Sequence, residues 1–438
     1  MRRNTQGMVI TVIGSGSSYT PMIVQELATR IERLPIAEIR LFDIDPKRQA
    51  IVAGFCRRLI GDQIRLTTPV SLESAVGGAS FVLSQFRVGG TSMRHKDILL
   101  GSKYDLIGQE TTGIGGFAKA LRTIPATLAV CSAMRKYAEK DAWLLNFTNP
   151  SGIITETALK YGGVRSIGLC NGPFNLRAAI VKTLRARPEH VVVDYVGTNH
   201  LGWVRKVFLQ NNDVSERVRK AHVSYSTANI PSAHSDPVFR RIMSLPYNSY
   251  LDYFYYEEAM LHKIKDARSN RAQEVAKVEK ALFKKYANPA TKEMPDDLKK
   301  RGGASYNLVA ANLIESIARD LNEVHIVNVQ NHGVVEHIED QSTVEVTCRI
   351  SAKGATPLFH GALPAQFRGL LQAVKAYEEL AVEAGVKGDL ESALHALVAH
   401  PLGPTACTAS ALLQDLLRIN AQYLPQFKPA AVRRFFKK

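Results

Sequence analysis

The chain has 438 residues, of which 45% are hydrophobic and 22% charged, and it carries a net charge of +16. This length allows two or three domains around a large core, and the composition is typical of a soluble globular protein. No window holds the roughly 18 to 20 apolar residues that a membrane span requires, so we expect no membrane partner. Lys and Arg are spread along the chain without interleaved aromatic residues, which argues against a nucleic-acid partner and favours a phosphorylated substrate.

The cysteines and the N-terminus bear on the cellular compartment. Five cysteines lie far apart, without a Cys-x-x-Cys pair, which favours a reducing compartment over a disulfide framework. The apolar run that follows Arg2 and Arg3 is short and ends in Gly-Ser, so it predicts a first strand and not a signal peptide. We therefore expect a cytoplasmic protein.

Strands and helices alternate over the first 170 residues. Apolar runs and helical spacing predict strands at residues 8–13, 38–42, 80–86, 143–147 and 164–169, and helices at residues 21–33, 46–60, 117–139 and 152–161. This alternation predicts a parallel, doubly wound sheet, in which ligands bind beyond the carboxyl ends of the strands. The residues at or just after the ends of these predicted strands carry chemistry or permit tight turns: Gly14, Asp43, Gln85, Asn149 and Cys170.

The pattern loosens after residue 196. Strands are predicted at residues 191–196, 203–209, 325–328 and 343–350, and helices at residues 271–286, 305–320, 365–384 and 406–423. We predict an α/β fold with a Rossmann-like, doubly wound parallel sheet over residues 1–196. A second α+β domain is predicted over residues 197–438, as in the architecture of lactate and malate dehydrogenases.

Residues 106–125 form a polar segment with Gly113, Gly115 and Gly116, and a helical pattern begins only at Phe117. Glycines let the backbone approach a ligand closely, and a helix N-terminus attracts anions. The segment therefore predicts a site for an anion or a sugar-like polyol. The alternative is an ordinary surface loop.

A shortened Gly-x-Gly-x-x-Gly motif follows the first predicted strand, as Gly14-Ser15-Gly16-Ser17-Ser18. Its glycines permit a tight turn and close approach of a pyrophosphate to a helix N-terminus. Alone the motif is a weak signal.

Asp43 ends the second predicted strand and strengthens the case for a dinucleotide. A carboxylate there can accept hydrogen bonds from both ribose hydroxyls and repels a 2′-phosphate, which favours NAD over NADP. The alternative for Asp43 is a helix cap ahead of Pro46.

Each of two further pairs of residues could have either a functional or a purely structural role. Cys170 and His200 could bind a divalent transition metal that keeps open coordination positions, or they could be a buried thiol and a satisfied imidazole. Arg301 and Tyr306 flank a predicted helix start, where they could serve a site or could be a solvated charge and a half-buried aromatic ring.

Seven segments of the chain resemble the NAD- and metal-dependent glycosidases of family 4, and most of all its bacterial 6-phospho-β-glucosidases. They are GSGSSYTP at residues 14–21, QFRVGG at 85–90, IGQETTGIGG at 107–116, NFTNPSG at 146–152, GLCN at 168–171, the Asn199-His200 pair, and RGGASY at 301–306. The segments occur in order over nearly the whole chain.

This resemblance implies a reaction by oxidation and elimination, which explains why no pair of opposed carboxylates stands out. NAD would oxidise C3 of the sugar, which acidifies the proton on C2. Removal of that proton would expel the aglycone from C1, water would add, and the hydride would return. A divalent metal, expected to be manganese, would act as a Lewis acid.

The resemblance also implies a role for each matching residue. Tyr306 matches the C2 base and needs nearby positive charge, because an unperturbed tyrosine has a pKa of about 10; Glu110 matches an acidic residue that modulates it. Asn171 stands where α-specific relatives have an aspartate, which favours β-glucosides. The implied metal ligands are Cys170 and His200, the substrate ligands Arg94 (for the 6-phosphate), Asn149, Asn171 and Arg301, and the NAD contacts Gly14, Ser15, Gly16, Ser17, Ser18, Asp43, Gln85 and Arg87.

Two departures from the family pattern and several rival functions remain. Gln330 stands where the family has an arginine, and Gly172 replaces an aliphatic residue. The rivals are another 6-phosphoglycoside specificity, α-gluco or galacto, a lactate- or malate-type dehydrogenase, and a non-catalytic NAD-dependent sensor. We expect a homodimer or homotetramer.

Overall fold

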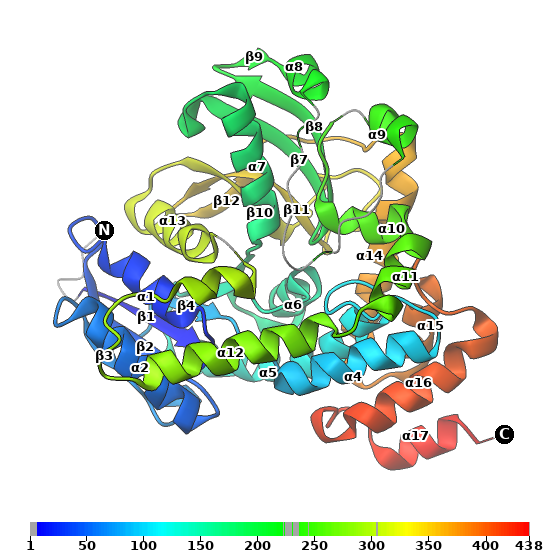
Figure 1. Cartoon of the computed structure of the whole chain (residues 1–438), viewed down its shortest axis with the longest axis horizontal. Coiled ribbons are helices and arrows are strands. Elements are labelled where there is room, and N and C mark those ends of the chain that lie inside the picture. The colour runs from blue at the N-terminus through cyan, green and yellow to red at the C-terminus, as the bar shows by residue number, and fades with distance from the viewer. Residues whose placement is uncertain are drawn as a thin grey trace.

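The computed structural model describes residues 7–221, 223, 230, 236–243, 245–303 and 305–437 (Figure 1). Six parallel strands lie in the order β3 (Arg65–Thr67), β2 (Ile36–Phe42), β1 (Met8–Ile13), β4 (Phe81–Ser84), β5 (Trp143–Asn146) and β6 (Arg165–Gly168). This order is that of a doubly wound dinucleotide-binding sheet. It confirms the predicted fold class.

The helices of this half connect successive strands. They are α1 (Thr20–Ala28), α2 (Pro46–Ile60), α3 (Leu72–Val76), α4 (Gly90–Lys103), α5 (Ile114–Tyr137), α6 (Ser151–Thr157) and α7 (Asn171–Leu184). The helix predicted from residue 117 begins earlier, at Ile114, and the helix predicted to end at residue 161 continues past α6 as a π-helical turn, Ala158–Gly162. Helices α4 and α7 were not predicted.

The second half of the chain extends the same sheet. β10 (Glu323–Gln330) meets β6 antiparallel at Asn328 and Gly168, and the order continues through β11 (Thr343–Ser351), β7 (Val191–Thr198), β8 (Leu201–Leu209) and β9 (Asn212–Asp213), with β12 (Gly354–Pro357) beside β11. The predicted boundary between residues 196 and 197 falls inside β7. The division into two domains therefore remains a prediction.

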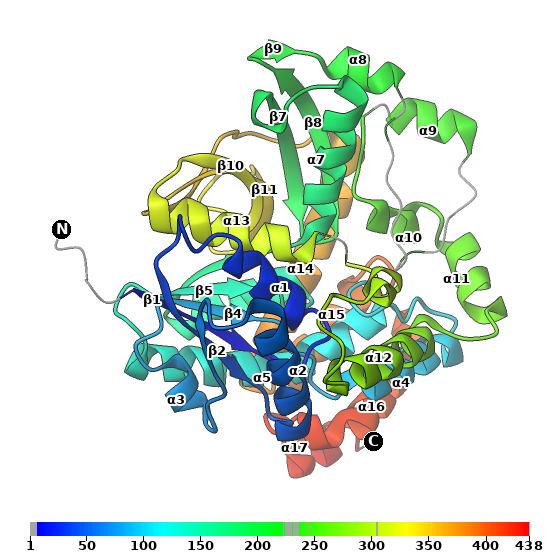
Figure 2. The same cartoon turned by 60° about the vertical axis from the view of Figure 1, so that its left-hand side comes forward.

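Late helices return to cover the dinucleotide half. Helix α12 (Arg271–Ala287) packs on α2 and α4, α13 (Tyr306–Arg319) on α1, and α14 (Ala365–Lys387) on α5, as Figures 1 and 2 show. The remaining helices are α8 (Ser215–Lys220), α9 (Pro237–Met243), α10 (Asp252–Tyr255), α11 (Glu257–Asp266), α15 (Leu390–Ala399), α16 (Ala406–Asn420) and α17 (Pro429–Phe435).

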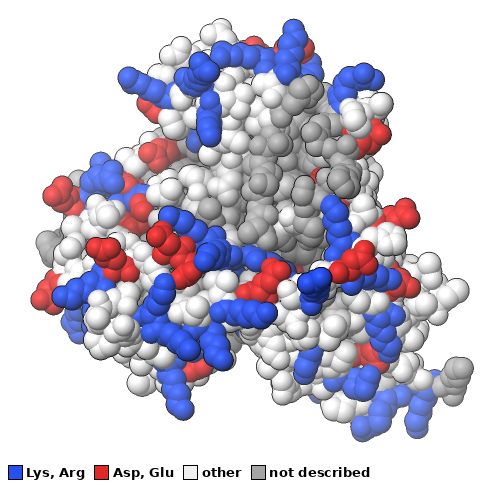
Figure 3. Space-filling view, in the orientation of Figure 1, with Lys and Arg blue, Asp and Glu red and all other residues white. Residues whose placement is uncertain are grey.

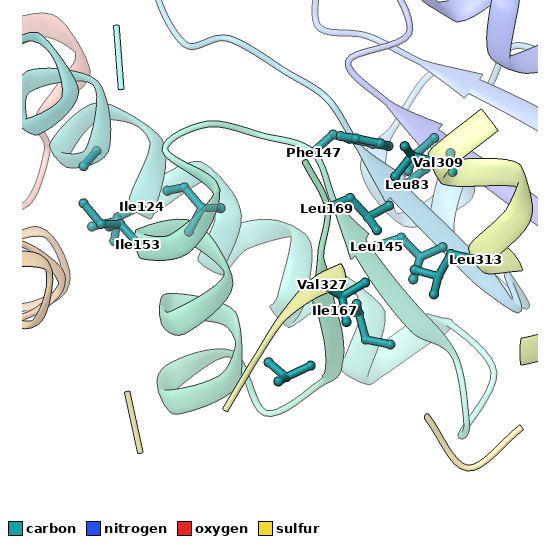
Figure 4. Packing of buried hydrophobic residues seen from close by; sticks show 14 of the residues in the cluster. Leu83, Ile124, Leu145, Phe147, Ile153, Ile167, Leu169, Val309, Leu313 and Val327 are labelled. Atoms are coloured by element: carbon teal, nitrogen blue, oxygen red, sulfur yellow. The ribbon is translucent and has the colours of Figure 1, made fainter. Parts of the chain in front are cut away.

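The main hydrophobic core spans both halves of the chain. Leu83, Leu145 and Ile167 on neighbouring strands of the parallel sheet join one cluster with Val327 of β10 and Leu313 of α13 (Figure 4). Burial of this apolar surface, worth about 25 cal/mol per Å², therefore ties the two halves together. The carboxyl edge of the parallel strands, where the predicted site residues lie, is supported by elements from both.

The described helices include none long and apolar enough to cross a membrane. Figure 3 shows Lys and Arg spread over this face of the molecule, with Asp and Glu between them. Residues 1–6, which contain Arg2 and Arg3, lie outside the described residues.

Candidate active site

The glycine loop after β1 is pressed against the ends of two neighbouring strands. Gly14 has a φ of +81°, and a Cβ atom there would stand 2.7 Å from Phe86. The backbone N–H of Gly16 donates to Asp43 Oδ2 over 2.7 Å, and a Cβ atom on Gly16 would stand 2.8 Å from that oxygen. Both positions therefore require glycine.

Asp43 belongs to this loop contact and does not cap the following helix. Its other oxygen, Oδ1, accepts from the N–H of Asp45 over 2.9 Å, and it is Asp45 that caps α2, by accepting from Lys47 and Arg48. The capping alternative for Asp43 is therefore wrong. The cap lies two residues later along the chain.

Two buried polar atoms near this edge have no hydrogen-bond partner within the described structure. They are Ser15 Oγ in the glycine loop and Gln85 Oε1 after β4. Gln85 is held in place because its Nε2 donates to Thr20 Oγ1 over 2.7 Å. Buried polar groups normally have partners, so these atoms fit a polar ligand such as a dinucleotide at this edge.

A cluster of one acid and three bases lies beside the glycine loop. Glu110 is in direct contact with Arg87, and it is 3.5 Å from both Arg94 Nη2 and Lys119 Nζ. Burial would raise the pKa of Glu110, but Arg87, Arg94 and Lys119 together hold it well below the usual range. Glu110 is therefore a permanent anion surrounded by an excess of positive charge.

Two members of this cluster, Arg94 and Glu110, line a cavity of about 260 Å³ together with Gln109 and other residues. Arg94 is only 3% exposed, and its Nε and Nη1 find no hydrogen-bond acceptor in the described part of the chain. Burial and the neighbouring Arg87 lower the pKa of Lys119 to about 7. An anion entering this cavity would satisfy both the charge and the unpaired N–H groups of Arg94.

A second cavity of about 660 Å³ is larger but contains none of the predicted site residues. It lies between β8 and the segment leading into α14, where Trp203, Arg205, Phe359 and Phe367 line it. Within the described structure, the larger cavity is lined by one residue with an unpaired buried nitrogen, Arg219, whereas Arg94 and Gln109 bring three such nitrogens to the smaller cavity. Because the smaller cavity is also lined by the predicted site residue Glu110, we place the site there.

His200 occupies the tight turn between β7 and β8 with a φ of +65°, a conformation that costs a non-glycine residue about 1–2 kcal/mol. The imidazole stacks on Tyr250, with ring centroids 3.7 Å apart, and its Nδ1 lies 2.7 Å from Thr111 Oγ1. Burial lowers the pKa of His200 to about 3. The ring is therefore neutral at physiological pH.

The hydrogen bonds around Thr111 fix which nitrogen of His200 carries the proton. The Oε1 of Gln109 accepts from the backbone N–H groups of Thr111 and Thr112, and Thr111 Oγ1 donates its only proton to the same oxygen over 2.8 Å. Thr111 Oγ1 must then accept from His200, so Nδ1 carries the hydrogen. The lone pair is left on Nε2, which is what a metal ligand requires.

Cys170 is connected to this turn through Asn199, the residue before His200. It caps the N-terminus of α7, where its Sγ accepts from the Gly172 N–H over 3.3 Å, and the side chain of Asn199 lies beside that sulfur. Burial, and then the charge of Glu345, raise the pKa of the thiol. Within the described ranges no three His, Cys, Asp or Glu side chains form a metal cluster, so a metal held by this pair would keep open positions for other ligands.

Tyr306 begins α13 and stacks between two other rings. Its ring centroid is 3.8 Å from that of Phe147 and 5.2 Å from that of Tyr19. Arg301 is only 8% exposed, lies 5.1 Å from the Tyr19 ring and donates to Glu279 over 3.2 Å, so it is not a solvated charge. Burial and Tyr19 raise the pKa of Tyr306 well above its ordinary value, although Arg301 opposes them.

Two predicted substrate ligands follow strand ends at this edge, and a departure from the family pattern lies in a separate loop. Asn149 follows β5 and is partly buried, and Asn171 opens α7 directly after Cys170. Asn331, beside the departure at Gln330, accepts from Val335 and donates to the carbonyl of Ile338, within its own loop. Ala304, within the RGGASY segment, lies outside the described residues.

The glycines of residues 106–125 serve packing within the chain. Cβ atoms on Gly115 and Gly116 would stand 2.5 Å and 2.6 Å from backbone atoms of Gln109 and Thr111. The N–H of Gly113 at the start of α5 points to His400 Nε2, 3.3 Å away. The expectation that these glycines admit a ligand to the backbone is therefore wrong, and so is the surface-loop alternative, because Gln109 and Glu110 of this segment are buried in the site.

Several residues of the site were given no role by the sequence analysis, although some of them lie within the quoted segments. Lys119 lies in an otherwise apolar stretch of α5, and a buried charge of this kind is the signal that could have revealed it. The others are Tyr19, Gln109, Thr111, Phe147, Asn199, Tyr250 and Glu279, which are ordinary polar or aromatic residues. Gln109 contacts its neighbours Thr111 and Thr112, and the rest make contacts across large separations in sequence.

Comparisons with known proteins show the family of the chain. Residues 9–186 match the model of the family 4 glycosyl hydrolases, and residues 195–403 match the model of the C-terminal domain of that family. The chain belongs to glycosyl hydrolase family 4. It is 40% identical, over 95% of this chain and 99% of the relative, to the 6-phospho-beta-glucosidase BglT of Thermotoga maritima.

More distant family members and solved structures extend the comparison. The maltose-6′-phosphate glucosidase of Bacillus subtilis is 30% identical over 97% of this chain and 98% of the relative. The Thermotoga maritima 6-phospho-beta glucosidase solved with manganese, NAD+ and glucose-6-phosphate matches with a TM-score of 0.87 and 38% identity over 95% and 99% of the two chains. A lactate dehydrogenase of Eimeria maxima, 15% identical with a TM-score of 0.53, shares the fold.

Proposed function

We propose that this family 4 member hydrolyses 6-phospho-β-glucosides with the help of NAD and a divalent metal, expected to be manganese. The observation that carries the proposal is the state of His200, which is neutral and keeps its lone pair on Nε2, while the preceding residue, Asn199, interacts with Cys170. This pair lies near the glycine loop and a positively charged cavity. A simple hydroxy-acid dehydrogenase has no use for such a ligand pair.

The residues present fit both cofactors. Gly14, Gly16 and Asp43 would hold the dinucleotide, and the unpaired Ser15 Oγ offers it a further hydrogen-bonding group. When bound, NAD accepts and returns a hydride at C3 of the sugar while the metal withdraws charge from the neighbouring oxygens.

The charged cavity supplies the recognition of the 6-phosphate. Arg87, Arg94 and Lys119 carry three positive charges against the single negative charge of Glu110, which leaves an excess of two when Lys119 is protonated. Arg94 would donate its two unpaired N–H groups to the phosphate oxygens. Glu110 would keep the three basic side chains together before the substrate arrives.

Tyr306 would take the proton from C2 at its phenolic oxygen. Arg301 favours the phenolate but does not outweigh burial and Tyr19. The bound ligands must therefore bring further positive charge before Tyr306 can act as a base at neutral pH. Stacking against Phe147 and Tyr19 would fix the position of the Tyr306 ring relative to the sugar.

The β-linkage is proposed from Asn171, whose amide cannot supply a proton to the leaving oxygen as a carboxylic acid could. A panel of α- and β-linked aryl 6-phosphoglycosides of glucose and galactose tests this assignment. We expect cleavage of the β-glucoside, and preferential cleavage of the α-linked compound would overturn it. Light scattering tests the expected homodimer or homotetramer.

The reaction route is tested by turnover in D2O with NAD and Mn²⁺. Because C2 loses its proton before the aglycone leaves, the glucose 6-phosphate formed should carry solvent deuterium at C2, which NMR detects. Cleavage without deuterium at C2 would exclude the elimination route. Net accumulation of NADH from a hydroxy acid, without cleavage, would instead favour a dehydrogenase.

A further inference from the structure

A buried carboxylate lies behind the Cys170–His200 pair. Glu345 on β11 is 0% exposed, and it receives hydrogen bonds from Asn199 Nδ2 over 3.3 Å, Asn328 Nδ2 over 2.9 Å and Tyr195 Oη over 3.2 Å. Burial raises the pKa of the Cys170 thiol and the Asn199 side chain lowers it, which places the amide beside that sulfur. The same amide therefore contacts Glu345 and lies beside one of the two proposed metal ligands.

The donors around Glu345 cannot exchange roles with it. The Oδ1 of Asn199 accepts from the Ser151 N–H, and the Nδ2 of Asn328 also faces the carbonyl of Gly168, so both amides must present Nδ2 to Glu345. Tyr195 Oη already accepts from Asn248 Nδ2 and must donate to Glu345. Three fixed donors on two oxygens suit an ionised carboxylate.

This buried negative charge has no cationic neighbour within the described residues. No Lys, Arg or His nitrogen of those residues lies within 4 Å of its oxygens, whereas the nearby Glu156 and Glu378 both pair with Lys375. Burial raises the pKa of Glu345 to about 7 despite the three hydrogen bonds. An unpaired buried charge is costly, so an arrangement that retains it needs a compensating cation.

We propose that Glu345 is the outer-sphere counter-charge of the metal centre and positions Asn199 against Cys170. One thiolate and one carboxylate together balance a divalent cation, while the neutral imidazole of His200 adds no charge. Partners of this kind in the outer shell commonly change metal affinity by 10- to 100-fold. The inference rests on the proposed function, because it takes Cys170 and His200 as metal ligands.

The test is a titration of metal-free, full-length protein with Co²⁺ at pH 8, followed by the thiolate-to-cobalt absorption band in the near ultraviolet. Wild type should show the band, and Cys170→Ser should abolish it. Glu345→Gln should keep the band but require about 10- to 100-fold more Co²⁺ to reach half of its intensity. Calorimetric titration with Mn²⁺ should give the same ratio of dissociation constants.

Glu156→Gln is the matched control, because it removes a carboxylate of the same type that is equally buried but is paired with Lys375. It should leave Co²⁺ affinity within twofold of wild type and should lower the urea midpoint of the metal-free protein. Glu345→Gln should have the opposite effects. It should weaken Co²⁺ binding, and the urea midpoint of the metal-free protein should equal or exceed that of wild type, because an uncompensated charge has been removed.

The outcomes separate the two proposals. If wild type shows no thiolate band, the metal centre itself is wrong, and the role of Glu345 fails with it. If the band forms but Glu345→Gln binds Co²⁺ as tightly as wild type, only the role of Glu345 is overturned. Should Glu345→Gln not fold, Tyr195→Phe removes one donor from Glu345 and should weaken Co²⁺ binding without loss of the band; unchanged affinity would again overturn the inference.

Discussion

The two sides of the proposed active site are held together by different kinds of interaction. On the dinucleotide side, the loop of Gly14 and Gly16 is held by backbone groups that hydrogen-bond to the end of β2 nearby. On the proposed substrate side, Glu110 forms ion pairs with Arg87, Arg94 and Lys119, which come from separate helices and loops. The first region is held by backbone hydrogen bonds, and the second by a balance of charges.

This difference determines what each region tolerates. A loop held by backbone hydrogen bonds should tolerate side-chain changes that keep its conformation. It should lose stability and NAD binding when a Cβ atom is added at one of its glycines. A cluster held by ion pairs should tolerate changes of side-chain shape better than changes of charge, because each buried charge is stabilised by the others. The predictions below test this contrast from the largest expected effect to the smallest.

Glu110→Gln should have the largest effect. It leaves the basic side chains of the cluster without their anion, and we expect the free energy of unfolding, measured by urea denaturation, to fall by about 3 kcal/mol. Glucose 6-phosphate should then raise the melting temperature more in this variant than in wild type, since the phosphate replaces the missing charge. The double variant Glu110→Gln/Lys119→Met should recover part of the loss. A single variant as stable as wild type would contradict the charge-balance account.

Gly16→Ala tests the glycine loop on the dinucleotide side. The added Cβ atom would stand 2.8 Å from Asp43 Oδ2, so we expect a loss of about 1–3 kcal/mol of stability from overpacking together with weaker NAD binding in a fluorescence titration. Gly54→Ala is the control, because the nearest atom to its Cβ would be Arg58 Nη1 at 3.8 Å. Because Gly54 lies in the middle of α2, replacing it with alanine should raise the free energy of unfolding by about 0.5–1 kcal/mol. Equal effects of the two alanines would contradict the account.

The same contrast explains what could be predicted from the sequence. The bounds of β1 and α2 were predicted correctly because period, cap and turn residues all lie within a few neighbouring positions. Helix α4 was missed because its buried face includes Arg94 and Asp97 and shows no apolar stripe. The glycine loop and Asp43 belong to the predictable region, since their partners lie close along the chain or at the next strand end.

The substrate side resisted prediction for a physical reason. The contacts of Glu110, Thr111 and Lys119 depend on how α4, α5 and the β7–β8 turn are packed, and periodicity contains no information on this. The glycines at 115 and 116 were misinterpreted for the same reason, because the backbone they approach belongs to their own segment. Family resemblance proposed roles for Arg94 and His200, but it could not supply the hydrogen bonds that set their state.

Lys119 should make substrate binding depend on pH. Its pKa of about 7 in the free protein means that it is mostly charged at pH 6 and mostly neutral at pH 8, while a phosphate monoester, with a second pKa of about 6, is already a dianion above pH 7. Binding of the dianion favours protonated Lys119, so KM should rise as the pH increases through 7, by up to about tenfold per pH unit. Lys119→Met should have a higher KM at pH 6 and a flatter profile between pH 7 and pH 8. An unchanged slope would show that another group titrates.

The smallest effect is expected within the dinucleotide side, where two neighbouring carboxylates have different partners. Asp43 and Asp45 are two residues apart and both accept backbone hydrogen bonds, but Asp43 accepts from Gly16 of the glycine loop and Asp45 caps α2. Asp45→Ala should therefore cost about 1 kcal/mol of stability and leave the dissociation constant of NAD within twofold of wild type. Asp43→Ala should weaken NAD binding and reduce the preference for NAD over NADP, because it removes the carboxylate that repels a 2′-phosphate. If Asp45→Ala weakened NAD binding as much as Asp43→Ala, the loop would depend on the helix cap, and the dinucleotide side would not be an independent unit of backbone contacts.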